Sequence, residues 1–205
     1  NDDGTYAPSK NITRAELATI IIYVLGLQDA AELAKYNYSQ FSDVKTGAWY
    51  TGAINIAANE KVVQGYPDGT FKPNEKVSYA EATTMLINAL GLNQVVNKSG
   101  GTWPSNYMSK AAQLGITKDI VGVSGADSAT RGDICLMAWE TLLQEKFQKI
   151  SKSFPVYELI KSYGPDHDQT FEVVVHLGDK TYGPKSGKSK KEAEQNVAKE
   201  ALNFI

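Results

Sequence analysis

Cysteine and histidine are scarce in this chain of 205 residues, which contains one Cys and two His. A single cysteine, Cys135, excludes an intrachain disulfide, and its apolar neighbours Ile134 and Leu136 favour a buried, unreactive thiol. The two histidines, His167 and His176, are far apart in the pattern and belong to no recognisable cluster of metal ligands. We therefore expect neither a metal ion nor another cofactor.

Long apolar runs and a large excess of one charge are also missing. No segment is apolar over enough length to span a bilayer, so we expect no membrane insertion. The formal net charge is −2; residues 141–205 hold 10 lysines and 9 acids, and residues 1–140 hold 11 basic and 14 acidic side chains. Nucleic-acid binding would therefore need a local basic patch. The absence of an initiator Met and of a signal peptide is typical of a fragment or a mature piece.

What the first part of the chain does contain is an internal repeat. Residues 1–27 align without gaps with residues 66–92, and 11 of these 27 positions are identical. A third, more diverged copy pairs residues 49–62 with residues 103–116, which share a tryptophan and two adjacent alanines. Self-similarity of this kind is typical of repeated units that bury a shared core. The expected repeats are 1–27, which lacks its front half, 41–92 and 102–140.

Each repeat contains a helix that begins with a hydroxyl residue followed three positions later by an acid. The hydroxyl accepts a hydrogen bond from a first-turn amide, and the carboxylate accepts one from the amide of the capping residue. Apolar residues then follow at helical spacing, for example Leu17, Ile20, Ile21 and Val24. The capping boxes therefore predict three helix N-termini. The pairs are Thr13 with Glu16, Ser78 with Glu81, and Thr130 with Asp133.

Two boxes carry an arginine at their second position, Arg14 and Arg131, where capping does not require one. An arginine there adds a bidentate donor beside free backbone amides and the positive end of the helix dipole, which suits a carboxylate or a phosphate. A solvated arginine, or one that forms a salt bridge to a neighbouring repeat, explains the residue equally well. The middle repeat has Tyr79 at this position, so we expect it to bind an anion poorly.

Together with the boxes, the segments Phe41–Val44 and Gly65–Phe71 and the side chain of Trp49 resemble S-layer homology repeats over about residues 1–140. The resemblance implies an all-α, pseudo-threefold repeat bundle on the bacterial cell surface that binds pyruvylated secondary cell-wall polysaccharide, with the box arginines contacting the acidic ketal. Trp49 and Trp103 would line grooves or pack in the core, and we expect core packing. The implied polymer-binding residues are Thr13, Arg14, Glu16, Thr130, Arg131 and Asp133.

The chain from Thr141 onward is predicted to fold as a helix, three strands and a helix, which makes the fold class α+β overall. Residues 141–150 continue a helical pattern that Pro155 ends. The final helix begins at Ser189, which is placed to form a capping box with Glu192. The expected strands are 156–161, 171–177 and 180–182.

Positive charge gathers at the start of the last helix, where backbone amides already point outward. Lys188 precedes this helix, and Lys190 and Lys191 lie in its first turn, an arrangement that suits the phosphates beside a groove. A lysine cluster alone also fits a solvated helix end. Polar side chains on one face of the first helix and in the loop 164–167 favour the phosphate interpretation, because three separated contact regions recognise double-stranded RNA by its shape.

Residues 141–205 resemble a double-stranded-RNA-binding domain, and closely that of bacterial ribonuclease III. The resemblance is carried by Leu143–Glu145, Pro155–Leu159, Gly164–His167, Phe171–Val173 and Gly187–Gln195. It implies a cytoplasmic location and double-stranded RNA as the partner. Pro184 and Lys185 in the loop before the last helix, and Glu194 where many relatives carry a lysine, depart from the pattern and imply moderate affinity. The implied RNA-binding residues are Gln144, Glu145 and Gln148 for one minor groove, Pro165, Asp166 and His167 for the next, and Lys188, Lys190 and Lys191 for the phosphates between them.

The sequence predicts a binding protein and not an enzyme. The acidic signature helix of the ribonuclease is absent, and the carboxylates of residues 1–140 fall in caps and turns. Because the wall polymer is extracellular and duplex RNA is cytoplasmic, two hypotheses stay open. The repeats are a scaffold for an RNA-binding domain, or the chain is a wall-anchoring protein whose last domain does not bind RNA; an engineered fusion would fit either.

The junction between the two parts contains no flexible linker. Glu140 ends the third repeat and Thr141 begins the next helix, so residues 134–150 are expected to form one helix across the domain boundary at 140/141. Natural multidomain chains usually place glycine, proline or polar residues at such a boundary. We therefore suspect a natural or constructed chimera.

Overall fold

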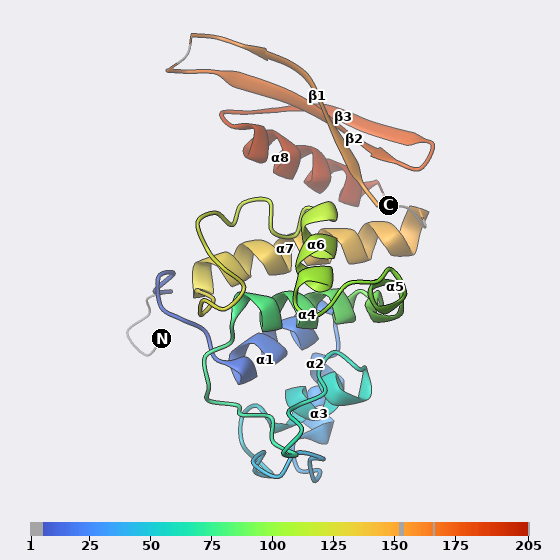
Figure 1. The fold of residues 1–205 in the computed structure, drawn as a ribbon. Coiled ribbons are helices and arrows are strands. Elements are labelled where there is room, and N and C mark those ends of the chain that lie inside the picture. The colour runs from blue at the N-terminus through green and yellow to red at the C-terminus, as the bar shows by residue number, and fades with distance from the viewer. Residues whose placement is uncertain (1–5, 152–153, 166, 205) are drawn as a thin grey trace. The chain divides into compact units, whose positions relative to one another are not determined.

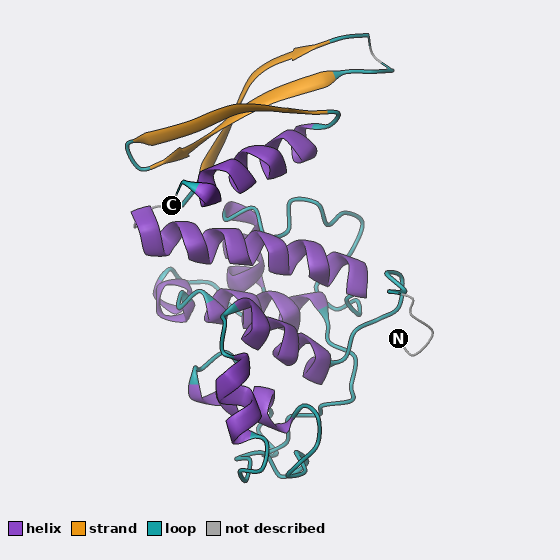
Figure 2. Cartoon of the chain, turned by 180° about the vertical axis from the view of Figure 1, so that it is seen from behind, coloured by secondary structure: helices purple, strands orange, loops and turns teal. Residues whose placement is uncertain are grey.

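The chain folds into two compact units, residues 1–142 and 143–205. The structure, a computed structural model, describes residues 6–151, 154–165 and 167–204. The described part of the first unit is helical, whereas the second unit carries a three-stranded sheet and a helix (Figures 1 and 2). The α+β class predicted from the sequence is therefore confirmed.

Seven helices begin in the described part of the first unit. The helices α1 and α4 start with complete capping boxes, in which Thr13 and Ser78 each accept a hydrogen bond from the third residue and the following glutamate accepts one from the cap amide. In the third box, the amide of Asp133 donates to Thr130 Oγ1 over 3.2 Å. The helices are α1 (Arg14–Val24), α2 (Gln28–Ala34), α3 (Thr51–Asn59), α4 (Tyr79–Ala89), α5 (Asn93–Lys98), α6 (Ser105–Gln113) and α7 (Arg131–Ser151).

The segments that precede the three boxes meet in a closed ring of backbone hydrogen bonds. The amide of Ile12 donates to the carbonyl of Ala129 over 3.0 Å, Ala129 donates to Val77 over 2.8 Å, and Val77 donates back to Ile12 over 3.1 Å. All three side chains are buried. Because each of these residues lies just before a helix, the ring brings the N-termini of α1, α4 and α7 together, and this positions the arginines of the boxes.

The helix α7 continues without a break across the boundary between the two units, so the prediction of one helix over residues 134–150 is confirmed. The prediction of a buried thiol was wrong, because Cys135 is exposed. Ile134, Met137 and Ala138 occupy the buried face of the helix. Since successive residues of an α-helix point about 100° apart, the side chain that follows Ile134 faces outward.

The described strands of the second unit form an antiparallel sheet in the order β1-β2-β3. The helix α8 (Lys190–Asn203) packs against β2 and β3, and its Ala193, Val197 and Ala201 are buried with Val173 and Val175 of the sheet. The last strand extends further than expected, so that Pro184 and Lys185 lie in β3 and not in a loop. The strands are β1 (Val156–Tyr163), β2 (Thr170–Leu177) and β3 (Lys180–Gly187).

Candidate binding sites

Arg14, at the start of α1, is buried although it is charged, with 6% of its surface exposed. Its Nη1 forms a salt bridge with Glu81 Oε1 over 2.8 Å, and its Nε donates to the carbonyl of Phe71 over 2.8 Å. The guanidinium carbon lies 4.6 Å from the ring centre of Tyr66 and 4.8 Å from that of Phe71. Ion pairing and contact with two aromatic faces thus hold the guanidinium in one position.

Tyr66 and Glu81 are electrostatically linked to this arginine. Tyr66 donates its hydroxyl to Glu81 Oε1 over 2.6 Å, and burial together with this bond raises the pKa of Tyr66 to about 12. Burial acts to raise the pKa of Glu81, but hydrogen bonds from Ser78 and Tyr66 and the charge of Arg14 outweigh it and lower that pKa. At neutral pH the cluster therefore holds an ionised carboxylate, a guanidinium and a protonated phenol.

These side chains form one wall of a cavity of about 630 Å³, a size typical of small-ligand sites. Trp103 lies at the same cavity and donates its indole N–H to Thr84 Oγ1 over 3.0 Å. Trp49 and Trp103 are 60% and 56% exposed, so the expectation that they pack in the core was wrong. The lining residues include Arg14, Tyr66, Glu81, Thr84, Asn88 and Trp103.

Arg131, at the start of α7, repeats the arrangement of Arg14 in a more exposed form. Its Nη1 pairs with Glu16 Oε1 over 3.1 Å, and its Nε donates to the carbonyl of Tyr6 over 3.0 Å. The guanidinium carbon lies 5.3 Å from the ring centre of Tyr6. Tyr6 and Glu16 align with Phe71 and Glu81 at the repeat shift, so the two arginines occupy equivalent positions.

The middle repeat completes the pattern with a different residue. Tyr79, at the second position of its box, donates its hydroxyl to Asp133, the acid of the third box. Each box thus contacts the acid of another repeat: Arg14 contacts Glu81, Tyr79 contacts the third repeat, and Arg131 contacts the first. The inter-repeat salt bridge left open by the sequence is therefore present, and an anion-binding role for the arginines stays a prediction.

In the second unit, two of the predicted RNA-contact regions are joined by an ion pair. Lys188 Nζ lies 2.7 Å from Asp168 Oδ1, which links the start of α8 to the loop between β1 and β2. His167 and Pro165 of this loop are exposed, and Asp166 lies outside the described residues. The loop and the lysine cluster are therefore adjacent on one surface.

The start of α8 is capped as predicted by its serine, but its acid makes a different bond. Ser189 Oγ accepts a hydrogen bond from the amide of Glu192 over 3.1 Å, while Glu192 Oε2 accepts one from the amide of Lys188 over 2.6 Å. Lys190 is exposed and pairs with Glu194 at 4.0 Å, and Lys191 is half-buried. The carboxylate of Glu194, which departs from the RNA-binding pattern, reduces the local positive charge.

The predicted contact face on α7 is less accessible. Gln144 and Glu145 are 4% and 7% exposed, and Gln148 is half-buried. Glu145 also pairs with Lys149 one turn further along the helix. Such burial leaves the first two side chains little surface for RNA, so their assignment stays a prediction.

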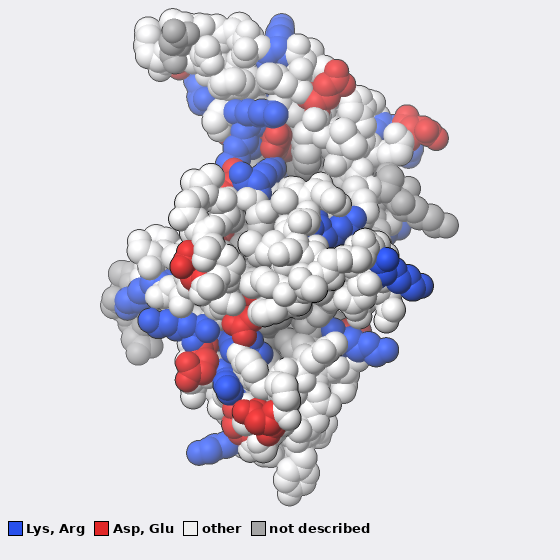
Figure 3. Space-filling model, in the orientation of Figure 1, with Lys and Arg blue, Asp and Glu red and all other residues white. Residues whose placement is uncertain are grey.

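Three other features bear on binding: the surface charge, groups that could hold a metal ion, and helices that could cross a membrane. Lysine and arginine are interspersed with acidic residues on the face shown in Figure 3. Within residues 6–151, 154–165 and 167–204, no group of three or more His, Cys, Asp or Glu residues is placed to hold a metal ion. No helix in the described part of the chain is both long and apolar enough to cross a membrane.

Comparison with known proteins finds several similar chains. This chain is 40% identical over 148 residues to the Middle cell wall protein of Brevibacillus brevis, covering 72% of this chain and 14% of that protein. It is 42% identical over 118 residues to the Surface layer protein of Brevibacillus choshinensis, covering 58% and 10%. It is 59% identical over 67 residues to Ribonuclease 3 of Treponema denticola, covering 33% and 27%. The chain thus spans less than a third of each of these relatives.

Two families account for the two parts of the sequence. Residues 1–18 and 40–83 match the S-layer homology domain. Residues 140–205 match the double-stranded RNA binding motif. The resemblances carried by the capping boxes and by the lysine-rich helix start are therefore confirmed. The chain combines an S-layer homology domain with a double-stranded RNA binding motif.

Proposed function

We propose that this chain is a non-catalytic binding protein whose second unit binds double-stranded RNA by shape. The observation that supports this function best is the ion pair between Lys188 and Asp168. This pair shows that the exposed loop of His167 lies beside the first turn of α8, where Lys190 and Lys191 adjoin backbone amides. A minor-groove probe and a phosphate clamp are thus arranged on one surface.

In this binding mode, each region meets a different part of the duplex. The imidazole of His167 and the backbone of its loop enter a minor groove and contact 2′-hydroxyls. Lys188, Lys190 and Lys191 contact the phosphates that border the adjacent major groove, with the dipole of α8 adding to their attraction. Of the predicted α7 residues, the half-buried Gln148 is the one with surface to meet the next minor groove.

Titration of the full chain with a duplex RNA of about 16 base pairs, at two salt concentrations, tests the proposal. The variants Lys190→Ala and Lys191→Ala remove phosphate contacts, and Lys180→Ala, an exposed lysine at the start of β3, is the matched control. We expect weaker binding and a shallower salt dependence for the first two variants only. Absence of binding, or equal loss in the control, would refute the proposal.

We further propose that the first unit is a pseudo-threefold repeat bundle that binds pyruvylated cell-wall polysaccharide, as S-layer homology domains imply. The ring that joins Ile12, Ala129 and Val77 supports the threefold arrangement. The cavity beside Arg14 supports the ligand, because hydrogen bonds within the described structure use two of the five guanidinium N–H donors. The other donors would bind the ketal carboxylate, and Trp103 would cover a sugar face.

Binding of pyruvylated wall polymer and of the same polymer after removal of pyruvate tests this second function. We expect Arg14→Gln and Arg131→Gln to weaken binding of the pyruvylated polymer and to leave binding of the other unchanged. The Lys190→Ala variant serves as the control, because it alters only the second unit. Polymer binding that ignores both arginines would contradict the assignment.

A further inference from the structure

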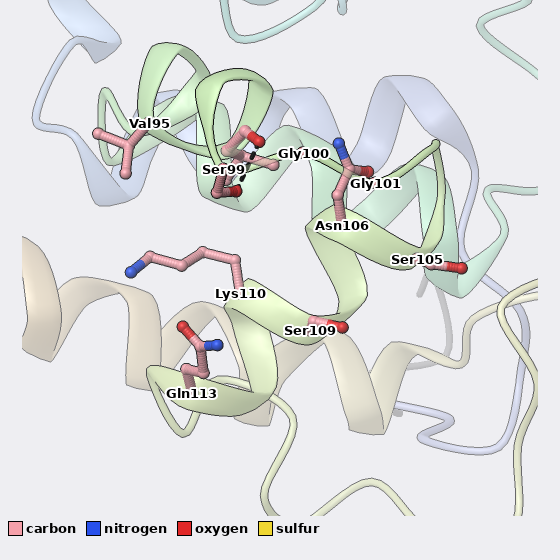
Figure 4. A pocket seen from close by; sticks show the side chains of 10 residues that line it. Val95, Ser99, Gly100, Gly101, Ser105, Asn106, Ser109, Lys110 and Gln113 are labelled. Atoms are coloured by element: carbon pink, nitrogen blue, oxygen red, sulfur yellow. Dashed lines mark hydrogen bonds between the residues drawn. The ribbon is translucent and has the colours of Figure 1, made fainter.

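A second polar cavity, of about 340 Å³, lies between α5 and α6. Its lining shares no residue with the Arg14 cavity. Figure 4 shows Val95 and Ser99 facing Lys110 and Gln113 of α6 across an open space. The lining residues are Val95, Val96, Ser99, Gly100, Gly101, Ser105, Asn106, Ser109, Lys110 and Gln113.

One residue difference between the repeats lies at this opening. The alignment of residues 49–62 with 103–116 pairs Gly52 of α3 with Asn106 of α6. A Cβ atom on Gly52 would lie 1.8 Å from the carbonyl oxygen of Ala31, so α2 and α3 touch through their backbones at this glycine. Asn106 has a side chain at that point, and close approach of α5 is prevented.

Before α6, a different glycine, Gly101, makes the close contact with this helix. A Cβ atom on Gly101, whose φ is +86°, would lie 3.4 Å from the Cβ of Asn106. The loop of Gly100 and Gly101 therefore packs beside Asn106, while α5 stands away from the middle of α6. At the equivalent point α2 and α3 are in backbone contact, and the cavity lies between α5 and α6 only.

The side chains of the lining are mostly polar and uncharged. Six lining side chains carry hydroxyl, amide or ammonium groups, and none carries a carboxylate, so the cavity does not suit a metal ion. Lysine is its one cation, a single point charge without the bidentate geometry of an arginine. Hydroxyls and amides that both donate and accept match the hydroxyl groups of a sugar, and the exposed Val95 offers an apolar contact.

We propose that the cavity between α5 and α6 binds one neutral sugar unit, a hexose or an N-acetylhexosamine. The unit enters between Ser99 and Ser109, with Lys110 and Gln113 hydrogen-bonding its hydroxyls. The bound sugar unit is a free monosaccharide or an internal unit of a polysaccharide, because both present the same hydroxyl groups. The site differs from the Arg14 cavity in requiring no acidic group, and it does not depend on the function proposed there.

The test is a backbone-amide NMR titration of the full chain with N-acetylglucosamine and with glucose. We expect saturable shifts at residues 99–113 with at least one sugar. Ser109 is exposed on α6, so Ser109→Trp obstructs the cavity without disturbing the core, and Thr46→Trp, at an exposed loop position, is the control. The obstructed variant should bind about tenfold more weakly, and the control should bind as the wild type does.

Two outcomes would overturn the proposal: no saturable shifts with either sugar, or unchanged binding by Ser109→Trp. Titration of wall polymer lacking pyruvate identifies the source, because an internal unit requires that Ser109→Trp weaken this binding and that the control Thr46→Trp leave it unchanged. Failure of the pyruvate-dependent binding proposed above would leave these expectations intact.

Discussion

Replacement of Arg14 by glutamine should destabilise the first unit strongly, whereas the same change at Arg131 should have a small effect. Arg14→Gln removes a charged hydrogen bond to Glu81 in a buried setting, which contributes about 1.5–3 kcal/mol. It also removes contacts with two aromatic faces, of about 0.5–1 kcal/mol each. Because Tyr66 and Ser78 still pair with Glu81, we expect a loss of about 2–4 kcal/mol in unfolding free energy.

The equivalent pair at Arg131 is the internal control. Its side chain is 23% exposed and that of Glu16 is 34% exposed, against 7% and 22% for Arg14 and Glu81. Solvent screening limits such a pair to about 0.2–1 kcal/mol. The two arginines make the same kinds of bond, so the deeper burial of Arg14 and its second aromatic contact should separate their effects.

Urea unfolding followed by tryptophan fluorescence measures this difference. The three tryptophans, Trp49, Trp103 and Trp139, all lie in residues 1–142, so the signal reports the first unit without a contribution from the second. We expect a clearly lower midpoint for Arg14→Gln and a midpoint near that of the wild type for Arg131→Gln. Equal destabilisation by the two variants would refute the argument from burial.

Three further predictions follow from the same contacts. The folded-state pKa of Glu81 is lowered, so its contribution to stability is present above its ordinary pKa of 4.5 and is lost as the pH falls through the folded-state value. Glu81→Gln should therefore make the urea midpoint depend less on pH in the acid range, as urea unfolding at several pH values would show. Glu194→Lys removes the carboxylate paired with Lys190, so it should tighten duplex RNA binding and steepen its salt dependence in a titration; unchanged affinity would contradict this role. Gly52→Ala places a methyl group against a backbone carbonyl and should lower the unfolding free energy by about 1–3 kcal/mol, whereas Asn106→Ala should change it little. Equal urea midpoints for the two variants would contradict the close backbone contact described for Gly52.

Local features of the fold were predictable from the sequence because neighbouring residues determine them. The capping boxes of Thr13 and Ser78 depend on residues three positions apart, and the structure confirms both. The same holds for the serine cap of α8 and for the unbroken α7, which contains no glycine or proline near the unit boundary. The C-terminal part of β3, residues 183–187, was not predicted, because proline is unusual within a strand and Pro184 lies there.

Features that depend on contacts between repeats could not be predicted in the same way. The sequence left Arg14 as an anion site or as a salt-bridge partner, and its neighbours Glu81 and Phe71 are distant along the chain. The exposure of Trp103 and the burial of Gln144 likewise result from tertiary packing. The sequence alignment pairs Gly52 with Asn106. Only the structure, which places α2 against Gly52, shows that this difference affects helix packing.

The central claim is that two separate surfaces bind two kinds of ligand. The most direct measurement is the affinity of the full chain for a duplex RNA of about 16 base pairs, compared among the wild type, Lys190→Ala and Arg131→Gln in a native buffer. We predict that the wild type binds, that Lys190→Ala binds more weakly, and that Arg131→Gln binds as the wild type does. Absence of wild-type binding, or equal weakening by both variants, would contradict the claim.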